Sequence, residues 1–208
     1  MEDVLELYAE PYDARYPVVC MDETSKQLVG ETRIPLAAQP GRPRRVDYEY
    51  ERRGTADVFM FTEPLRNWRR AEVSATRTRV DWAIQMKNLI DVVYRDAIKI
   101  RVVSDNLNTH SNASFYEAFP PEEARRLAAK LEMHHTPKHG SWLNIAEIEL
   151  RALTGQCMNR RIETAEILRR EVRAWQTQRN DSGARVQWHF KASDARIHLD
   201  RLYPRLLP

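Results

Sequence analysis

The sequence has no long hydrophobic run, and no stretch approaches the roughly 18 apolar residues of a membrane-spanning helix. Its beginning, MEDVLELYAE, is acidic and lacks the basic-then-apolar order of a signal peptide. It contains only two cysteines, Cys20 and Cys157, which lie far apart in apolar surroundings. We therefore expect buried thiols without a disulfide, no membrane contact, and a cytoplasmic protein.

Internal repeats and low-complexity tracts are also missing from the 208 residues. A hydrophobic content of 42%, with five Trp, eight Tyr and five Phe, is enough for a large core and argues against disorder. Residues 151–208 hold 12 basic and 6 acidic side chains, whereas residues 1–150 hold 21 and 24. This asymmetry suits a protein that contacts phosphates at one end and holds cations elsewhere, although a solvated basic helix would look the same.

Two predicted strands run directly into an aspartate. The apolar run at residues 18–21 ends at Asp22, and the run at residues 98–103 leads to Asp105. The first run has the continuous apolar character of a strand buried on both faces, and the second is a strong strand through Ile98, Ile100, Val102 and Val103. A hairpin is predicted at 56–64 and 68–75, and a last strand at 131–135. Because the ends of neighbouring parallel strands meet at one sheet edge, we expect Asp22 and Asp105 to lie together.

A third carboxylate is predicted on the helix that follows residues 136–144. The apolar positions 146, 150, 153 and 157 form one stripe at helical spacing. Glu147 and Glu149 flank this stripe on opposite sides, so periodicity alone does not decide which of them faces a site. Asn144 and Glu147 also have the spacing of a capping box, which is a purely structural alternative for Glu147.

Three carboxylates in one place repel one another and therefore imply hard divalent cations. Mg²⁺ prefers oxygen ligands, and two such ions roughly 3.5–4 Å apart can activate a water and stabilise a leaving oxygen on phosphorus. The histidines at 134, 135 and 139 have no cysteine or spaced histidine partner that would complete a tetrahedral zinc site. We therefore predict a site for two Mg²⁺ (or Mn²⁺) ions rather than for zinc.

Basic residues gather in three parts of the chain, where we predict contacts with DNA. Residues 24–54 form an irregular, basic insertion, and insertions of this length are usually functional or mobile. The second part lies just before the helix of Glu147, and the third is the C-terminal helical region. The predicted contacts are Arg44, Arg45, Arg52 and Arg53 in the first part, Lys138, His139 and Asn144 in the second, and Arg160 and Arg161 in the third.

The segments MDETSKQLVGE, VSDNLNTH and TPKHGSWLNIAEIEL resemble, in this order, the three catalytic blocks of bacterial insertion-sequence transposases of the mariner superfamily. The resemblance extends over nearly the whole chain, including DYEYERRGTADVFMFTEP and DARIHLDRLYP. It implies an α/β, RNase H-like (retroviral integrase-like) mixed sheet flanked by helices, with a C-terminal helical extension. It also implies that Asp22, Asp105 and Glu147 are the catalytic, metal-binding Asp-Asp-Glu triad.

On this resemblance we expect a catalytic core at residues 1–160 and a basic helical extension at residues 161–208 that packs on it. Members of the family carry helix-turn-helix DNA-binding modules before the core, and we expect none in this chain. The implied reaction is Mg²⁺-dependent hydrolysis of phosphodiesters at transposon ends and strand transfer of the 3′-OH into target DNA, at a TA dinucleotide. The implied partners are double-stranded DNA and a second copy of the chain, near the bacterial nucleoid.

Two other functions remain open at this point. One is another metal nuclease of the RNase H-like fold, and the other is a non-enzymatic transposase remnant that binds DNA. The LNIAE block and the basic C-terminal region argue against the first alternative, and the intact triad of Asp22, Asp105 and Glu147 argues against the second.

Overall fold

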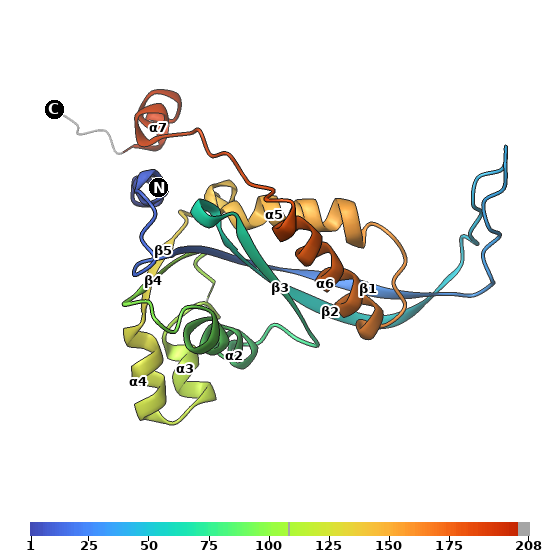
Figure 1. Cartoon of the computed structure of the whole chain (residues 1–208), viewed down its shortest axis with the longest axis horizontal. Coiled ribbons are helices and arrows are strands. Elements are labelled where there is room, and N and C mark those ends of the chain that lie inside the picture. Colours follow the sequence, from blue (N-terminus) through green and yellow to red (C-terminus); the bar gives the residue numbers. More distant parts are fainter. Residues whose placement is uncertain (108, 204–208) are drawn as a thin grey trace.

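A mixed five-stranded sheet in the order β3-β2-β1-β4-β5 lies at the centre of the computed structural model, which describes residues 1–107 and 109–203. The strands are β1 (Val18–Glu31), β2 (Tyr50–Glu63), β3 (Trp68–Ser74), β4 (Ile100–Ser104) and β5 (Leu131–His135). β1, β2 and β3 pair antiparallel, whereas β4 is parallel to both β1 and β5. This arrangement, visible in Figure 1, confirms the predicted mixed sheet.

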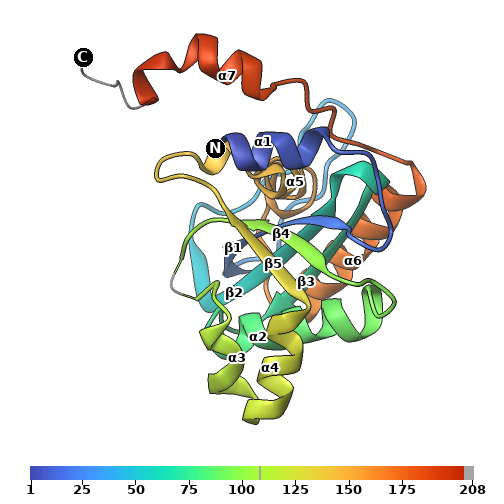
Figure 2. The same ribbon diagram turned by 90° about the vertical axis from the view of Figure 1, so that its left-hand side faces the viewer.

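Helices cover both faces of the sheet (Figures 1 and 2). One face carries α2 (Arg79–Asn88), α3 (Ala113–Ala118) and α4 (Pro121–Ala129), and the other carries α1 (Glu2–Ala9), α5 (Ile145–Leu153) and α6 (Ala165–Asp181). The last α-helix is α7 (Ala192–His198). Single turns of 3-10 or π helix occur at Pro64–Arg66, Leu89–Val93, Ser141–Leu143, Thr154–Met158 and Asp200–Leu202.

The apolar start of β1 is buried on both faces, as the sequence predicted. Val18 and Cys20 pack in the core below α1, α5 and α6, whereas Val19 and Met21 pack in the core below α2 and α4. All four residues are at most 2% exposed. Because successive side chains of a strand point to opposite faces, a continuous apolar run serves both cores at once.

The first strand does not end at Asp22, as the sequence indicated, but continues to Glu31. Its polar half pairs with β2 from Asp22, opposite Met60, to Glu31, opposite Tyr50. Beyond Asp22 most positions of β1 are partly or fully exposed, so they no longer require apolar side chains. The irregular basic segment is therefore limited to residues 32–49, here called the arm, which extends away from the helical body in Figure 1.

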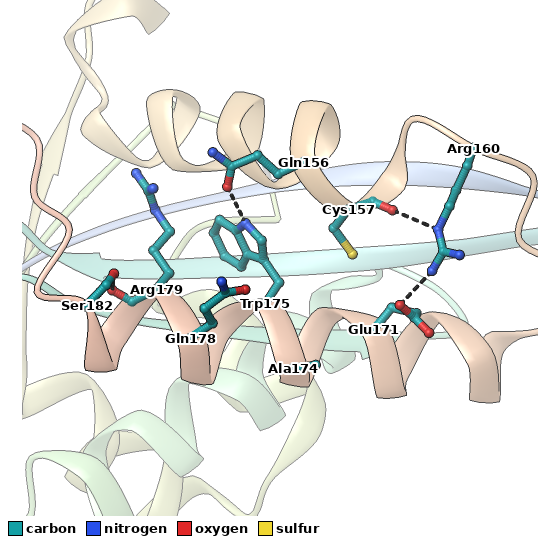
Figure 3. A pocket seen from close by; sticks show the side chains of 9 residues that line it. All are labelled: Gln156, Cys157, Arg160, Glu171, Ala174, Trp175, Gln178, Arg179 and Ser182. Carbon is teal, nitrogen blue, oxygen red and sulfur yellow. Dashed lines mark hydrogen bonds and ion pairs between the residues drawn. The ribbon is translucent and has the colours of Figure 1, made fainter. Parts of the chain in front are cut away.

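α6 packs along β3 and along the π-helical turn that follows α5. Figure 3 shows two polar contacts between α6 and the segment that follows α5. The indole of Trp175 donates to Gln156 Oε1 at 2.8 Å, and Arg160 pairs with Glu171 at 2.6 Å. Trp175 belongs to the same buried cluster as the side chains of α1 and α5. The boundary predicted at residue 160 stays a prediction, since the segments on its two sides share this core.

After α6 the chain crosses back to α7, which lies beside α1 (Figure 2). Arg196 of α7 pairs with Glu2 of α1 at 2.7 Å, so the two ends of the described chain are held together. Within the part of the chain that the structure describes, no helix has the length and apolar character needed to cross a membrane.

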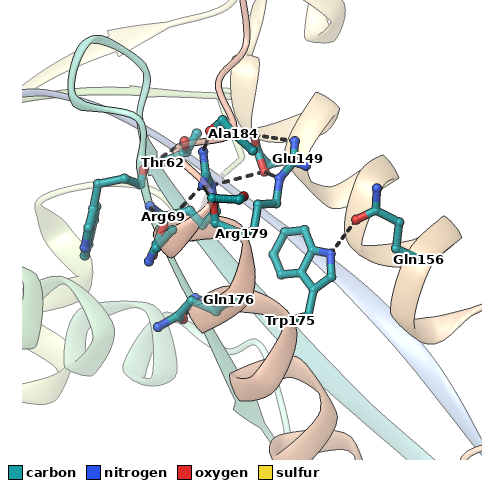
Figure 4. Close-up of polar contacts among 12 residues, drawn as sticks. Thr62, Arg69, Glu149, Gln156, Trp175, Gln176, Arg179 and Ala184 are labelled. Atoms are coloured by element: carbon teal, nitrogen blue, oxygen red, sulfur yellow. Dashed lines mark hydrogen bonds and ion pairs between the residues drawn. The ribbon is translucent and has the colours of Figure 1, made fainter.

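A buried ion-pair network joins α5, α6 and β3 (Figure 4). The side chains of Glu149 and Arg69 are 0% and 1% exposed and lie 3.3 Å apart. Arg179 donates to the two carboxylate oxygens of Glu149 at 2.7 and 3.1 Å. Arg69 also donates to the backbone carbonyls of Arg179 and Ala184. Removing the one anion from this network would leave two arginines without their counter-charge in the protein interior.

We therefore expect Glu149→Gln to lower the free energy of unfolding by about 3 kcal/mol. Glu147→Gln, two residues earlier but half-exposed, should lower it by no more than about 0.5 kcal/mol. Guanidinium unfolding of the two variants, followed by circular dichroism, measures both values. Equal stability of the two variants would contradict the role given to Glu149.

Candidate active site

The register of β1 and β4 brings the two predicted aspartates to one place. Cys20 of β1 pairs with Val103 of β4 in parallel orientation. Asp22 and Asp105 each follow two residues later, Asp22 within β1 and Asp105 just after the end of β4. The prediction that neighbouring parallel strands bring both carboxylates to the same region of the sheet therefore agrees with the observed register.

Asn144 fixes the start of α5 against β1. Its side-chain Nδ2 donates to the backbone carbonyl of Met21 at 2.8 Å, and its Oδ1 accepts from the backbone N–H of Ala146 at 3.1 Å. The second bond is an N-cap, and the first ties the helix to the residue before Asp22. Glu147 follows in the first turn. The predicted DNA contact of Asn144 stays a prediction and would have to break these bonds, because the residue is 1% exposed and its amide is already bonded at both ends.

Asp22 and Glu147 line one open cavity, and Asp105 lines a second one. Burial, together with the charges of Glu23, Asp105 and Glu147, raises the pKa of Asp22 to about 7 against the opposing hydrogen bond from the Glu23 N–H. Asp105 and Glu147 thus lie within electrostatic reach of Asp22. This influence on Asp22 is what a carboxylate with two negatively charged neighbours should show.

A divalent cation fits this set of donors. Carboxylate oxygens are the ligands that Mg²⁺ prefers, and a cation would remove the repulsion that disfavours the charged form of Asp22. Within residues 1–107 and 109–203, no three His, Cys, Asp or Glu side chains are close enough together to enclose a metal ion. The carboxylates therefore form an open acidic surface rather than a closed cage.

The structure distinguishes the two glutamates of α5 that periodicity left equivalent. Glu147 faces the cavity of Asp22, whereas Glu149 points to the opposite side, into the network with Arg69 and Arg179. Glu149 has no exposed surface and both of its oxygens are bonded. Only Glu147 is available to a ligand in the cavity, which favours it as the third carboxylate.

His110 takes part in this site through contacts that the sequence did not predict. His110 is 1% exposed and lies between two carboxylates, with Nδ1 at 2.6 Å from Asp105 Oδ1 and Nε2 at 3.0 Å from Glu23 Oε2. Burial lowers the pKa of His110, but the contacts with Asp105 and Glu23 outweigh it and raise that pKa to about 9. The spacing of Asp105 and His110 around a turn was a usable signal, whereas the contact with Glu23 was not visible in the sequence.

The predicted DNA contacts fall into two groups. Lys138 and His139 line the cavity of Asp105, and His139 has a left-handed backbone with φ of 63°. Arg44 and Arg45 on the arm and Arg52 at its base are exposed. These five stay predictions.

The other three predicted contacts are engaged in ion pairs. These pairs join Arg53 to Glu163, Arg160 to Glu171, and Arg161 to Glu31. Arg161 also donates to the backbone carbonyl of Asp47 at 2.6 Å, so it ties the arm to β1. DNA binding by these arginines stays a prediction and would have to compete with the contacts described.

The raised pKa of Asp22 predicts a pH-dependent effect of Asp22→Asn. A raised pKa gives a stabilising contribution that is present below the unfolded value of 3.8 and is lost as the pH rises toward the folded value of about 7. Asp22→Asn removes this dependence. In the presence of a chelator, the melting temperature of the variant relative to the wild type should increase by a few degrees between pH 5 and pH 7.5. Calorimetry at both pH values tests this, and a difference that stays constant with pH would contradict it.

Comparison with known proteins places the chain in a family. The model of a DDE superfamily endonuclease matches residues 17–169, which include all three carboxylates. Among solved structures, a Mos1 mariner paired-end complex with Mn aligns with a TM-score of 0.57 and 16% identity, over 88% of this chain and 55% of that chain. A Mos1 transposase paired-end complex with the left transposon end aligns with a TM-score of 0.57 and 14% identity, over 88% and 56%. No curated protein matches the chain.

At such low identity the Mos1 structures show the shared fold, and they confirm the predicted RNase H-like sheet with its flanking helices. The chain spans a little over half of the Mos1 chains, 55% and 56% of their length. The family assignment rests on the endonuclease model, which matches well over half of the sequence and includes Asp22, Asp105 and Glu147. The chain belongs to the DDE superfamily of endonucleases.

Proposed function

We propose that the chain is the catalytic domain of a mariner-type DNA transposase, in which Asp22, Asp105 and Glu147 form the catalytic triad. The observation that carries this proposal is the parallel register that brings Asp22 and Asp105 to the same end of β1 and β4, with Glu147 of α5 near enough for its charge to raise the pKa of Asp22. Membership of the DDE superfamily and the three sequence blocks support it.

The three carboxylates would hold two divalent cations, Mg²⁺ or Mn²⁺. Such ions activate the attacking water or 3′-OH and stabilise the leaving oxygen on phosphorus. The protein fixes the positions of the carboxylates that would bind these ions. The backbone pairing of β1 fixes Asp22, and the amide of Asn144 fixes Glu147. The first reaction would be hydrolysis of the phosphodiester at a transposon end, and the second would be transfer of the freed 3′-OH into target DNA.

Double-stranded DNA is the proposed partner, at the transposon end and at the target. The aligned Mos1 structures are paired-end complexes, one of them with the left transposon end. A homodimer in the active complex and a location at the bacterial nucleoid are proposed from the sequence resemblance alone.

Each of Asp22→Asn, Asp105→Asn and Glu147→Gln should reduce Mn²⁺- or Mg²⁺-dependent DNA nicking by about 100-fold or more, because each removes a metal-binding charge. Asp96→Asn is a matched control, since the Asp96 side chain is 90% exposed and bonded only to its neighbour Arg95 among the described residues. Nicking and strand transfer are measured with labelled duplex oligonucleotides at low salt. Wild-type rates in any triad variant would remove that residue from the proposed site, and nicking without strand transfer would favour a different metal nuclease.

The arm should bind DNA through phosphates rather than bases. Replacing both Arg44 and Arg45 with Ala should weaken binding of all duplex sequences about equally and reduce the slope of log K against log salt by roughly two. Replacing Arg15 and Arg95, whose side chains are 69% and 76% exposed on the body of the protein, gives a control with the same charge change. Fluorescence anisotropy at several salt concentrations measures both. An unchanged slope in the arm variant would exclude these arginines as phosphate contacts.

A further inference from the structure

Asp105 differs from the other two carboxylates in how its backbone is held. Asp22 lies within β1, which is paired on one side with β2. Glu147 lies in α5, whose start is tied to β1 by Asn144. Asp105 follows the last residue of β4 and has no helix or strand of its own. Its side chain is 33% exposed, so it needs another contact to keep one orientation.

That contact comes from the face of the sheet opposite α5. His110 lies against Trp82 of α2, with ring centroids 6.2 Å apart and an interplanar angle of 27°. Its backbone N–H donates to the carbonyl of Leu107 at 2.9 Å, which closes the turn after Asp105. Glu23 has the same strand parity as Met21, whose side chain belongs to the core below α2, so it approaches His110 from β1.

The imidazole therefore connects β1 to the turn after β4. Nδ1 is 2.6 Å from Asp105 Oδ1, and Nε2 is 3.0 Å from Glu23 Oε2. The side chain of Glu23 is only 4% exposed. In the described residues no donor reaches Asp105 Oδ2. His110 thus occupies one carboxylate oxygen of Asp105, and Asp105 also lines a cavity.

We propose that His110 is a positioning residue that holds Asp105 in the orientation in which it binds a divalent cation, with Glu23 as the anchor on the other side of the ring. This inference rests on the proposed function, because it takes Asp105 as a metal ligand. Groups that orient metal ligands by hydrogen bonds typically change metal affinity by about 10–100-fold when they are replaced.

The two ring nitrogens can be tested separately by substitution. In His110→Asn the side-chain amide takes the place of Nδ1 and can still donate to Asp105. In His110→Gln the amide takes the place of Nε2 and reaches Glu23 instead. Both variants remove the ring from Trp82, so they disturb the packing of this region in the same way.

The experiment is a titration of wild-type protein, both His110 variants and Asp105→Asn with Mn²⁺, followed by electron paramagnetic resonance. Thermal unfolding without metal is recorded for each protein. His110→Asn should bind Mn²⁺ within about threefold of the wild type, and His110→Gln should bind it about 10–100-fold more weakly. The two His110 variants should melt at similar temperatures.

Wild-type Mn²⁺ affinity in His110→Gln, together with weakened binding in Asp105→Asn, would overturn this inference and leave the proposed metal site intact. Equal loss of affinity in both His110 variants would assign the residue a packing role only and would also overturn it. Wild-type affinity in Asp105→Asn would overturn the metal site itself, and the inference with it.

Discussion

The burial of Asp22 beside other carboxylates is the constraint on which this structure depends. The pKa of Asp22 is raised to about 7 by burial and by neighbouring negative charges, so the folded protein keeps these groups together at a cost. A cluster of this kind persists only where the surrounding chain fixes each member. Here the members are mounted on a paired strand, on a helix that is tied to this strand, and on a turn that is tied to a buried histidine.

The face of α5 that points away from the cavity is held by ion pairs, and its start is held by Asn144. Glu149 joins α5 to β3 and α6 through two arginines, of which Arg69 is buried with it and Arg179 is 19% exposed. α5 therefore has an anchor at its first residue and another on the face away from the cavity. The two glutamates of this short helix therefore have different roles. Glu149 pairs with Arg69 and Arg179, whereas Glu147 faces the cavity of Asp22.

Much of this arrangement was predictable because it follows from local patterns. The apolar runs that precede Asp22 and Asp105 marked both strands, and their shared sheet edge followed from parallel pairing. The choice between Glu147 and Glu149 was not predictable from the sequence of the helix. It is decided by Arg69, the partner of Glu149, which lies in β3.

Three further features depended on contacts between distant segments. Asn144 looked like a surface residue, but its bond to the Met21 carbonyl buries it. The second half of β1 was missed because its side chains are mostly polar, and its pairing with β2 becomes visible only in the sheet. The contact between His110 and Glu23 joins residues that the sequence separates by a hairpin and a helix.

The continuous length of β1 fixes the distance between Asp22 and the start of the arm. Glu31, the last residue before the arm, lies nine positions after Asp22, and an extended strand of this length covers roughly 30 Å. One helical turn of duplex DNA measures about 34 Å. If DNA contacts both the carboxylates and the base of the arm, as proposed, the two contacts would lie about one helical turn of duplex apart. Lengthening or shortening both β1 and its partner β2 by two residues would change this distance while keeping the facing of every side chain.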